Sequence, residues 1–281
     1  VADGDTVRNL TASLMPLRSV NQPADQVIHE LLLSARGNSG NIASQFFSAF
    51  FMAEDISQLA HRAQTGTKKA WQAVSNPRPG TMLSVFDALA DALTGNLQPD
   101  KASVEVIIGS LENAVHATYE QLPRLKEAGV VDAGALGIYI FFEAFFYSLV
   151  GITAAFRPLA ATFKDRLKIA PAFQERTDSR YCVDVVVKAP RYSPEEIKII
   201  TCVEEEVIII PEGELYKIHL HTQDKEKVRK QIDGLGQVVS WEDDNLGEQV
   251  PQFMRSIDGQ TFHVMTDAAG SLTRADAKKN G

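Results

Sequence analysis

The sequence predicts two folded parts, an all-helical part at residues 1–168 and a small α+β domain at residues 176–246. Up to about residue 168, apolar residues recur at spacings of three and four, the period of a helix with one buried face. After Pro171, the chain consists of β-branched runs separated by turn residues, and their apolar residues recur with the period of two that is typical of strands. A chain of 281 residues with 44% hydrophobic content is long enough for more than one core.

The helical part contains four amphipathic stripes and one segment that is apolar nearly all round. The stripes are Val27, Leu31 and Ala35; Ile42, Phe46, Phe50 and Ala53; Val85, Leu89 and Leu93; and Val104, Ile108, Leu111 and Val115. Such stripes are typical of helix faces that pack into a core. Residues 138–150 predict a central buried helix, since this run is too short to cross a bilayer and is interrupted by Glu143.

The second part has the element order βαββαβ. Strands are expected at residues 182–188, 207–210, 215–221 and 237–241, and helices at 194–201 and 224–233. Asp224 can cap the second of these helices. The order predicts a split βαβ (ferredoxin-like) arrangement, in which the first and third strands lie side by side.

Composition excludes several classes of function. A net charge of −8 and a pI near 5.3 argue against nucleic-acid binding and against attraction to an anionic membrane. The two cysteines, Cys182 and Cys202, form no disulfide framework, and the sequence shows neither a signal peptide nor a transmembrane run. We therefore expect a soluble cytoplasmic protein that acts on small molecules. Because the chain starts within a motif and stops after a strand-like run, we expect a fragment.

The triplet Asp3-Gly4-Asp5 is a candidate magnesium site. Two carboxylates on either side of a glycine can address one hard cation if the backbone is extended or looped. Aspartate and glycine also dominate solvated turns, so the triplet alone fits a turn at least as well.

Three further corners each place small or capping residues before a helix. The segment RGNSG at residues 36–40 offers free N–H groups at a helix start, which can bind an anion. It lacks the Gly-Lys-Ser/Thr of a P-loop, and a plain helix–helix corner is the alternative. Thr81 can cap the helix after residues 76–80, and Asp132 the helix after residues 129–131. Three such corners in one helical domain indicate a shared ligand.

The motifs DGDT, ARGNSG, NPRPGTML and AGVVDAGALG occur in the order found in the Dak2 domain, which this part of the chain resembles. That domain is the nucleotide-binding half of dihydroxyacetone kinases and of the bacterial fatty acid kinase catalytic subunit. The resemblance implies an antiparallel barrel of about eight helices. It also implies ATP or ADP bound at one end through magnesium ions held by acidic residues.

The resemblance also implies roles for individual residues. Asp3 and Asp5 match two magnesium ligands and are candidate catalytic residues. The implied nucleotide-binding positions are Thr6 and Asn9 near the phosphates, Gly37, Asn38, Ser39 and Gly40 in the phosphate loop, Gly80, Thr81 and Met82 near base and sugar, and Asp132 and Gly134 beside the nucleotide. Two features depart from the family: Val7 replaces a glycine, and the family's further metal ligand falls upstream of residue 1.

Cys182, His219 and His221 form a candidate zinc site in the second domain. The two histidines are two apart on an expected strand and therefore project from one face, and Cys182 lies on the neighbouring strand. The alternative, which the residues alone favour, is a hydrogen-bonded histidine pair beside a small buried cysteine.

Residues 176–246 also resemble the middle domain of the fatty acid kinase subunit, at Tyr181-Cys182 and at HLHT (residues 219–222). This resemblance implies bound zinc and a part for both histidines in activity, whether catalytic or structural. Residues 247–281 are expected to be a linker and a strand. The run TFHVMTDAAGSL (residues 261–272) resembles the opening of a DegV-type lipid-binding domain, with Ala268 in place of a serine.

Taken together, these patterns predict an ATP-dependent phosphotransferase that converts a fatty-acid carboxylate to an acyl phosphate. The acid would be presented by a DegV-like domain in the same or another chain. The alternatives are a dihydroxyacetone-type triose kinase and a non-catalytic nucleotide-binding regulatory or scaffold protein. A homodimer is left open.

Overall fold

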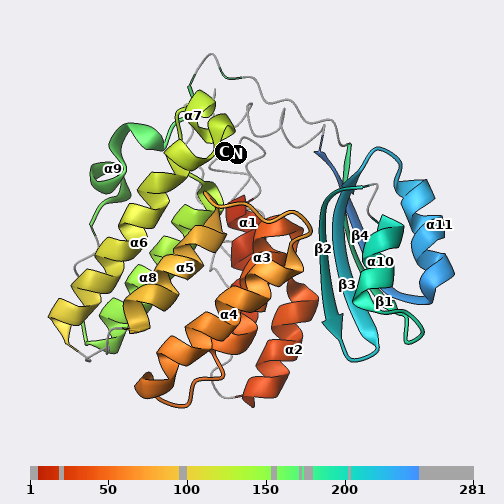
Figure 1. Ribbon diagram of the computed structural model, residues 1–281, viewed down its shortest axis with the longest axis horizontal. Coiled ribbons are helices and arrows are strands. Elements are labelled where there is room, and N and C mark those ends of the chain that lie inside the picture. The colour runs from red at the N-terminus through yellow and green to blue at the C-terminus, as the bar shows by residue number, and fades with distance from the viewer. Residues whose placement is uncertain are drawn as a thin grey trace, which may run out of the picture.

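A helical part and a four-stranded antiparallel sheet lie side by side in the computed structural model (Figure 1). The structure describes residues 6–18, 22–94, 100–152, 157–170, 173, 180–201 and 204–246. The expected linker and DegV-like strand at residues 247–281 lie outside the described residues. Within the described ranges, no helix combines the length and the apolarity that crossing a bilayer requires.

The helical part is built around α3, α5 and α8. Its helices are α1 (Thr6–Leu14), α2 (Ala24–Ser34), α3 (Gly37–Phe50), α4 (Leu59–Ala73), α5 (Met82–Thr94), α6 (Lys101–Gln121), α7 (Pro123–Ala128), α8 (Ala133–Leu149) and α9 (Leu159–Thr162), with 3₁₀ turns η1 (Met15–Arg18), η2 (Ile56–Gln58) and η3 (Lys164–Arg166). The rings of Phe46 and Phe86 stack with their centroids 4.0 Å apart, and Phe142 meets Phe46 edge-on at 5.8 Å. All three side chains are fully buried. Aromatic contacts of this kind stabilise a core beyond the area they bury.

The predicted apolar faces of α5 and α6 are buried throughout, and α8 is the central helix expected from its composition. Its one acidic residue, Glu143, is buried and accepts a hydrogen bond from the Tyr139 hydroxyl at 3.0 Å. Two expected stripes were too long, because Ala35 and Ala53 lie beyond the ends of α2 and α3.

The sheet has the strand order β2-β3-β1-β4, with each neighbouring pair antiparallel. Its strands are β1 (Tyr181–Lys188), β2 (Glu205–Glu212), β3 (Leu215–Thr222) and β4 (Gln237–Asn245), and its helices are α10 (Pro194–Thr201) and α11 (Lys225–Leu235). The first and third strands are neighbours, as expected. Asp224 caps α11 by accepting the Lys227 N–H at 3.0 Å. β4 runs four residues beyond its predicted end, through polar residues that carry no strand signal.

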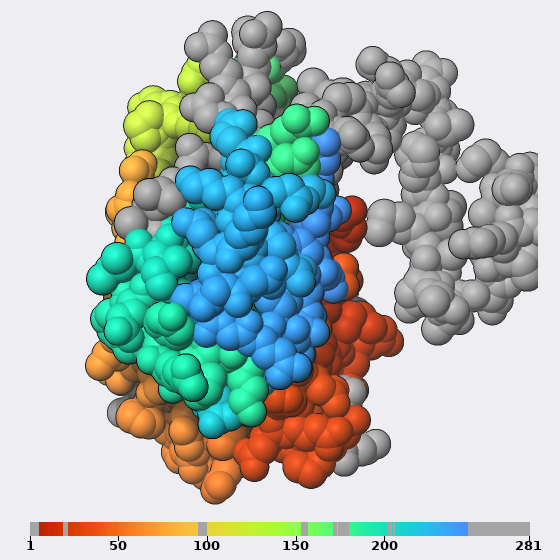
Figure 2. All heavy atoms as spheres, turned by 90° about the vertical axis from the view of Figure 1, so that its right-hand side faces the viewer, coloured from red at the N-terminus to blue at the C-terminus, as the bar shows by residue number. Residues whose placement is uncertain are grey.

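Alternate residues of the strands face two different layers. Val183, Val185 and Val187 pack toward α10 and α11, whereas Ile208 and Ile210 pack with Leu32 of α2. The backbone joins the two parts as well, because the Ser75 N–H donates to the Val207 carbonyl at 3.1 Å. The sheet is therefore covered on one face by α10 and α11 and on the other by the helical part (Figures 1 and 2). The side chains on this second face of the sheet lie against the helix starts of the helical part.

Candidate functional site

Three of the predicted nucleotide motifs meet at the start of α8. A methyl group added at Gly134 would lie 2.7 Å from Met82 Cε, 3.2 Å from Asp132 Oδ1 and 3.5 Å from Ser39 Oγ. These residues lie at the starts of α8, α5 and α3, and the starts of α3 and α8 are more than 90 residues apart in the sequence. The structure thus brings these helix N-termini together at one end of the helical part.

Helix α1, which begins at Thr6 of the fourth motif, packs closely against the start of α3. A methyl group at Gly37, whose φ is +60°, would collide with the amide of the buried Asn9, and one at Gly40 would collide with Ser13 Oγ. Both glycines are therefore required by the close approach of α1 to α3. Thr6 is half-buried and begins α1, while Val7 is 68% exposed. Asp3 and Asp5 lie outside the described residues.

Two of the predicted nucleotide positions have structural roles. Asp132 caps α8, with Oδ1 accepting the Ala135 N–H at 2.7 Å, and Thr81 Oγ1 accepts the Leu83 N–H at 3.3 Å at the start of α5. Gly80 has φ +89°, and its N–H donates to Ser84 Oγ at 2.9 Å. A methyl group there would meet the end of α6, so the left-handed turn at Gly80 packs against α6.

The expectation of free N–H groups at a helix start in residues 36–40 requires correction. The Gly37 N–H donates to Asp184 Oδ2 of the second domain at 3.0 Å, and the Gly40 N–H donates to the Arg36 carbonyl at 3.1 Å. Asn38 and Ser39 also belong to the first turn of α3, where N–H groups have no carbonyl partner within the helix. The Asn38 side chain itself donates to Glu206 of β2.

The strand register places the three candidate zinc ligands together. Cys182 pairs with His221 across β1 and β3, and His219 is two residues from His221 on the same face. One ligand atom from each residue lies within 4.8 Å of the others. His219 is fully buried, and its Nε2 has no hydrogen-bond partner among the described residues.

A thiolate with two imidazoles is a donor set that zinc prefers, and the unpartnered buried nitrogen is consistent with a ligand position. The residues therefore fit a zinc ion. Burial lowers the pKa of His221 to about 4, and the neighbouring His219 acts in the same direction, so its imidazole is neutral at pH 7. Burial opposes protonation of His219, but Asp184 and Cys182 outweigh it and raise the pKa of His219 to about 10. A metal would have to displace that proton, because imidazole coordinates as the free base.

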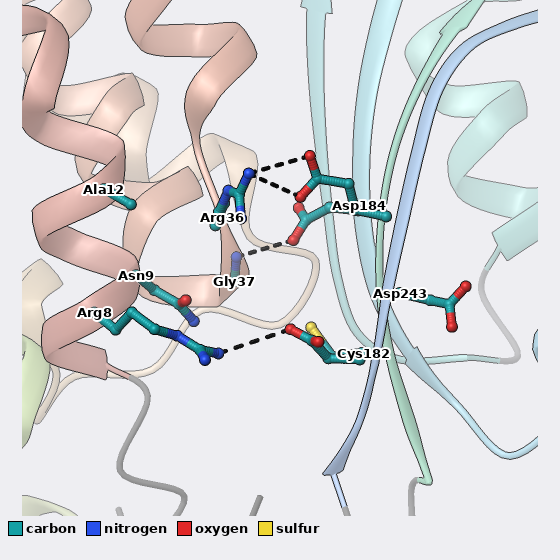
Figure 3. Close-up of a pocket in the computed structure, with 10 residues that line it drawn as sticks. Arg8, Asn9, Ala12, Arg36, Gly37, Cys182, Asp184 and Asp243 are labelled. Carbon is teal, nitrogen blue, oxygen red and sulfur yellow. Dashed lines mark hydrogen bonds and ion pairs between the residues drawn. The ribbon is translucent and has the colours of Figure 1, made fainter. Parts of the chain in front are cut away.

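A cavity of about 420 Å³ lies between the two parts and is lined by residues of both predicted sites (Figure 3). Asn9 and Gly37 line it from the helical part, and Cys182 and Asp184 from the sheet. Arg8 and Arg36 face it as well. Each forms an ion pair with β4, Arg36 with Glu242 at 3.2 Å and Arg8 with Asp244 at 3.7 Å.

Comparison with known proteins identifies the family of the helical part. The sequence model of the DAK2 domain matches residues 1–147, more than half of the chain. The chain belongs to the DAK2 domain family. The matched region contains all four sequence motifs, including Asp3 and Asp5 of DGDT.

Relatives match beyond the DAK2 domain. The chain is 28% identical to an uncharacterized protein of Staphylococcus haemolyticus, over 91% of this chain and 51% of that protein. It is 27% identical to the protein YloV of Bacillus subtilis, over 96% of this chain and 56% of that protein. An uncharacterized protein of Staphylococcus saprophyticus is 26% identical, over 89% of this chain and 50% of that protein. The chain therefore spans about half the length of the curated relatives it matches.

The sequence reasoning missed Asp184, which joins the second domain to the DAK2 domain. It is 8% exposed and lies directly opposite His219 in the sheet. Burial raises the pKa of Asp184, but the nearby His219 and Lys217 and the Gly37 N–H outweigh it and lower that pKa well below its usual range. In a strand, residues two apart point to the same face. The position of Asp184 two residues after Cys182 was therefore the sequence signal that could have placed it beside the candidate zinc ligands.

Proposed function

We propose that this chain contains the nucleotide-binding and phosphoryl-transferring part of an ATP-dependent kinase. Membership of the DAK2 family supports a kinase-related function and nucleotide binding. The observation that carries the proposal is the meeting of Ser39, Met82, Asp132 and Gly134 at the helix N-termini. Helix N-termini bind phosphate because their N–H groups are free and their dipoles favour negative charge.

In this proposal, the N–H groups of Asn38 and Ser39 hold the nucleotide phosphates, and Met82 and Gly134 line the nucleotide beside them. Asp3 and Asp5, which precede α1, are the proposed magnesium ligands. Magnesium would neutralise the β- and γ-phosphate charge, and positioning with charge neutralisation is most of what phosphoryl transfer requires.

A fatty-acid carboxylate is the acceptor that we favour. One carboxylate oxygen forms a bond to the γ-phosphorus as the bond to the β,γ-bridging oxygen breaks, which yields acyl phosphate and ADP. A carboxylate is already ionised at neutral pH and needs no general base. The Asp132 carboxylate, which caps α8, is then not needed as a general base. A triose hydroxyl, the alternative acceptor, would need a group to accept its proton.

The second domain contributes the proposed zinc site at Cys182, His219 and His221. The cavity lined by Asn9, Gly37 and Cys182 supports a functional connection between this site and the nucleotide. The proposal includes the family's helical barrel, a ferredoxin-like second domain and a DegV-like domain that presents the acid.

The test uses the full-length protein with ATP, magnesium and a long-chain fatty acid, with and without a DegV-like partner. Hydroxylamine traps acyl phosphate as a hydroxamate, and a parallel reaction contains dihydroxyacetone. We expect hydroxamate and ADP in equal amounts, and loss of both with Gly134→Val, which fills the space beside Met82. Gly109→Ala is the matched control, because a methyl group there meets nothing within 4 Å. Nucleotide binding without turnover of either acceptor would refute the kinase and favour the regulatory protein.

A further inference from the structure

Asp184 lies at the contact between the two parts of the molecule. It is on β1, on the same face as Cys182, and its neighbours across the sheet are His219 on one side and Glu242 on the other. Its side chain points from the sheet toward the start of α3 (Figure 3). Few carboxylates are buried to this extent, and those that are need partners that offset the loss of hydration.

Four hydrogen-bond donors surround this carboxylate. Oδ2 accepts the Gly37 N–H at 3.0 Å, and Oδ1 accepts the Asn41 side-chain amide at 2.9 Å. The same Oδ1 lies 3.3 Å from His219 Nδ1 and 3.9 Å from Lys217 Nζ. Two donors belong to α3 and two to β3, so one carboxylate contacts both parts of the molecule.

On the sheet side, Asp184 fixes the ring of a candidate metal ligand. Imidazoles that bind metal usually donate their other ring N–H to a carboxylate, which sets the tautomer and the ring orientation. Asp184 Oδ1 lies 3.3 Å from His219 Nδ1, which also faces Cys182 Sγ at 3.9 Å, so the carboxylate holds the ring beside the thiol. Nε2 of the same ring is the buried nitrogen without a partner among the described residues.

On the helix side, Asp184 fixes the first turn of α3. Gly37 is the first residue of that helix, and Asn41 donates both to the Gly37 carbonyl and to Asp184. These contacts orient the turn whose remaining N–H groups belong to Asn38 and Ser39. Any shift of Asp184 would therefore shift the groups proposed to hold phosphate.

We propose that Asp184 is a positioning residue that couples metal binding at Cys182, His219 and His221 to nucleotide binding at the start of α3. The inference rests on the proposed function. A metal that fixes His219 fixes Asp184, which in turn holds the first turn of α3 in place for phosphate. Thermodynamic linkage makes the effect reciprocal, so that nucleotide tightens metal binding by the same factor.

Asp184→Asn is the sharpest perturbation, because it keeps the size of the side chain and replaces one acceptor oxygen with an NH₂ group. All four neighbours of Asp184 are donors, so the new NH₂ must face one of them. Asp243→Asn is the matched control. Asp243 lines the same cavity, but its partners, Lys225 and Trp241, belong to its own domain.

The experiment measures the affinity for Mg·ADP by calorimetry with and without zinc, and the affinity for zinc by competition with a chromophoric chelator. In the unmodified chain we expect zinc to tighten Mg·ADP binding by at least about 5-fold, the lower end of typical couplings. In Asp184→Asn this factor should fall toward one, and zinc affinity should drop by about 10- to 100-fold. Asp243→Asn should change neither by more than about 2-fold, as expected for a surface substitution.

Zinc-independent Mg·ADP binding in the unmodified chain, or coupling that persists in Asp184→Asn, would overturn the inference. If Mg·ADP does not bind at all, the proposed function fails, and the zinc measurement still decides the role of Asp184, because unchanged zinc affinity in Asp184→Asn refutes it. Should Asp184→Asn not fold, Asn41→Ala takes its place. That variant leaves the contact with His219 intact, so it should keep zinc affinity and lose part of the coupling, and full coupling would overturn the proposal.

Discussion

Replacing Gly40 with alanine tests the close approach of α1 to α3 that places Asn9 beside the helix start. A methyl group at Gly40 would collide with Ser13 Oγ and lie 3.3 Å from the Asn9 carbonyl oxygen. Ser13 is fully buried, and its hydroxyl donates to the Asn9 carbonyl at 2.6 Å and accepts the Arg36 N–H at 2.9 Å. The new methyl group must therefore displace a side chain that makes two hydrogen bonds.

The size of the effect follows from these contacts. Each lost hydrogen bond costs about 1 kcal/mol, and overpacking a core adds about 1–3 kcal/mol. Alanine recovers up to about 1 kcal/mol of helix propensity. We therefore expect the free energy of unfolding to fall by about 3 kcal/mol, which lowers Tm by about 6–12 °C for a part of this size.

The assay is thermal unfolding followed by circular dichroism, with Gly109→Ala as the control. Gly109 lies within α6, where an added methyl group meets nothing within 4 Å, so alanine should raise Tm by about 1–3 °C. Two glycine-to-alanine changes in helices thus have opposite expected signs. If Gly40→Ala also stabilises the protein, α1 does not pack on α3 as described.

Three further results are expected. Asp132→Ala removes the cap of α8 and should reduce the free energy of unfolding by about 1 kcal/mol in denaturant titrations; no loss would show that the cap is not needed. Elemental analysis should find zinc in the purified chain and much less in His219→Ala and His221→Ala, and equal metal content in all three would exclude the site. Burial raises the pKa of Asp87 despite the hydrogen bond from Trp71, so its ionisation costs stability in the folded state. As pH rises through that ionisation the unmodified protein should lose stability relative to Asp87→Asn, and a constant difference in Tm across this pH range would contradict the assignment.

The sequence was most informative where a local period decides the outcome. Period two predicted that His219 and His221 share one face, and the strand order placed Cys182 on the neighbouring strand. The register of β1 and β3 brings the three residues together. Period 3.6 likewise identified the buried faces of α5 and α6. Asp132 was recognised as a cap because capping depends on contacts within one helical turn.

Contacts between the two domains left no local signal. Nothing in the segment RGNSG indicates that the N–H of Gly37 meets a carboxylate 147 residues away. Asp184 lies in a run that predicts a buried strand, and nothing in that run indicates a contact with α3. The polar end of β4 escaped notice for a related reason, since Glu242 and Asp244 face Arg36 and Arg8 and not a hydrophobic layer.

The central claim is that nucleotide binds where α3, α5 and α8 begin, and the methyl signal of Met82 tests it most directly. Met82 is 3% exposed and lies against Gly134, whereas Met52 follows the far end of α3, about 20 Å along the helix. In a protein labelled with ¹³C-methyl methionine and assigned through Met82→Leu, Mg·ADP should shift the Met82 signal and leave that of Met52 in place. Saturating Mg·ADP that leaves the Met82 signal unchanged would contradict the claim.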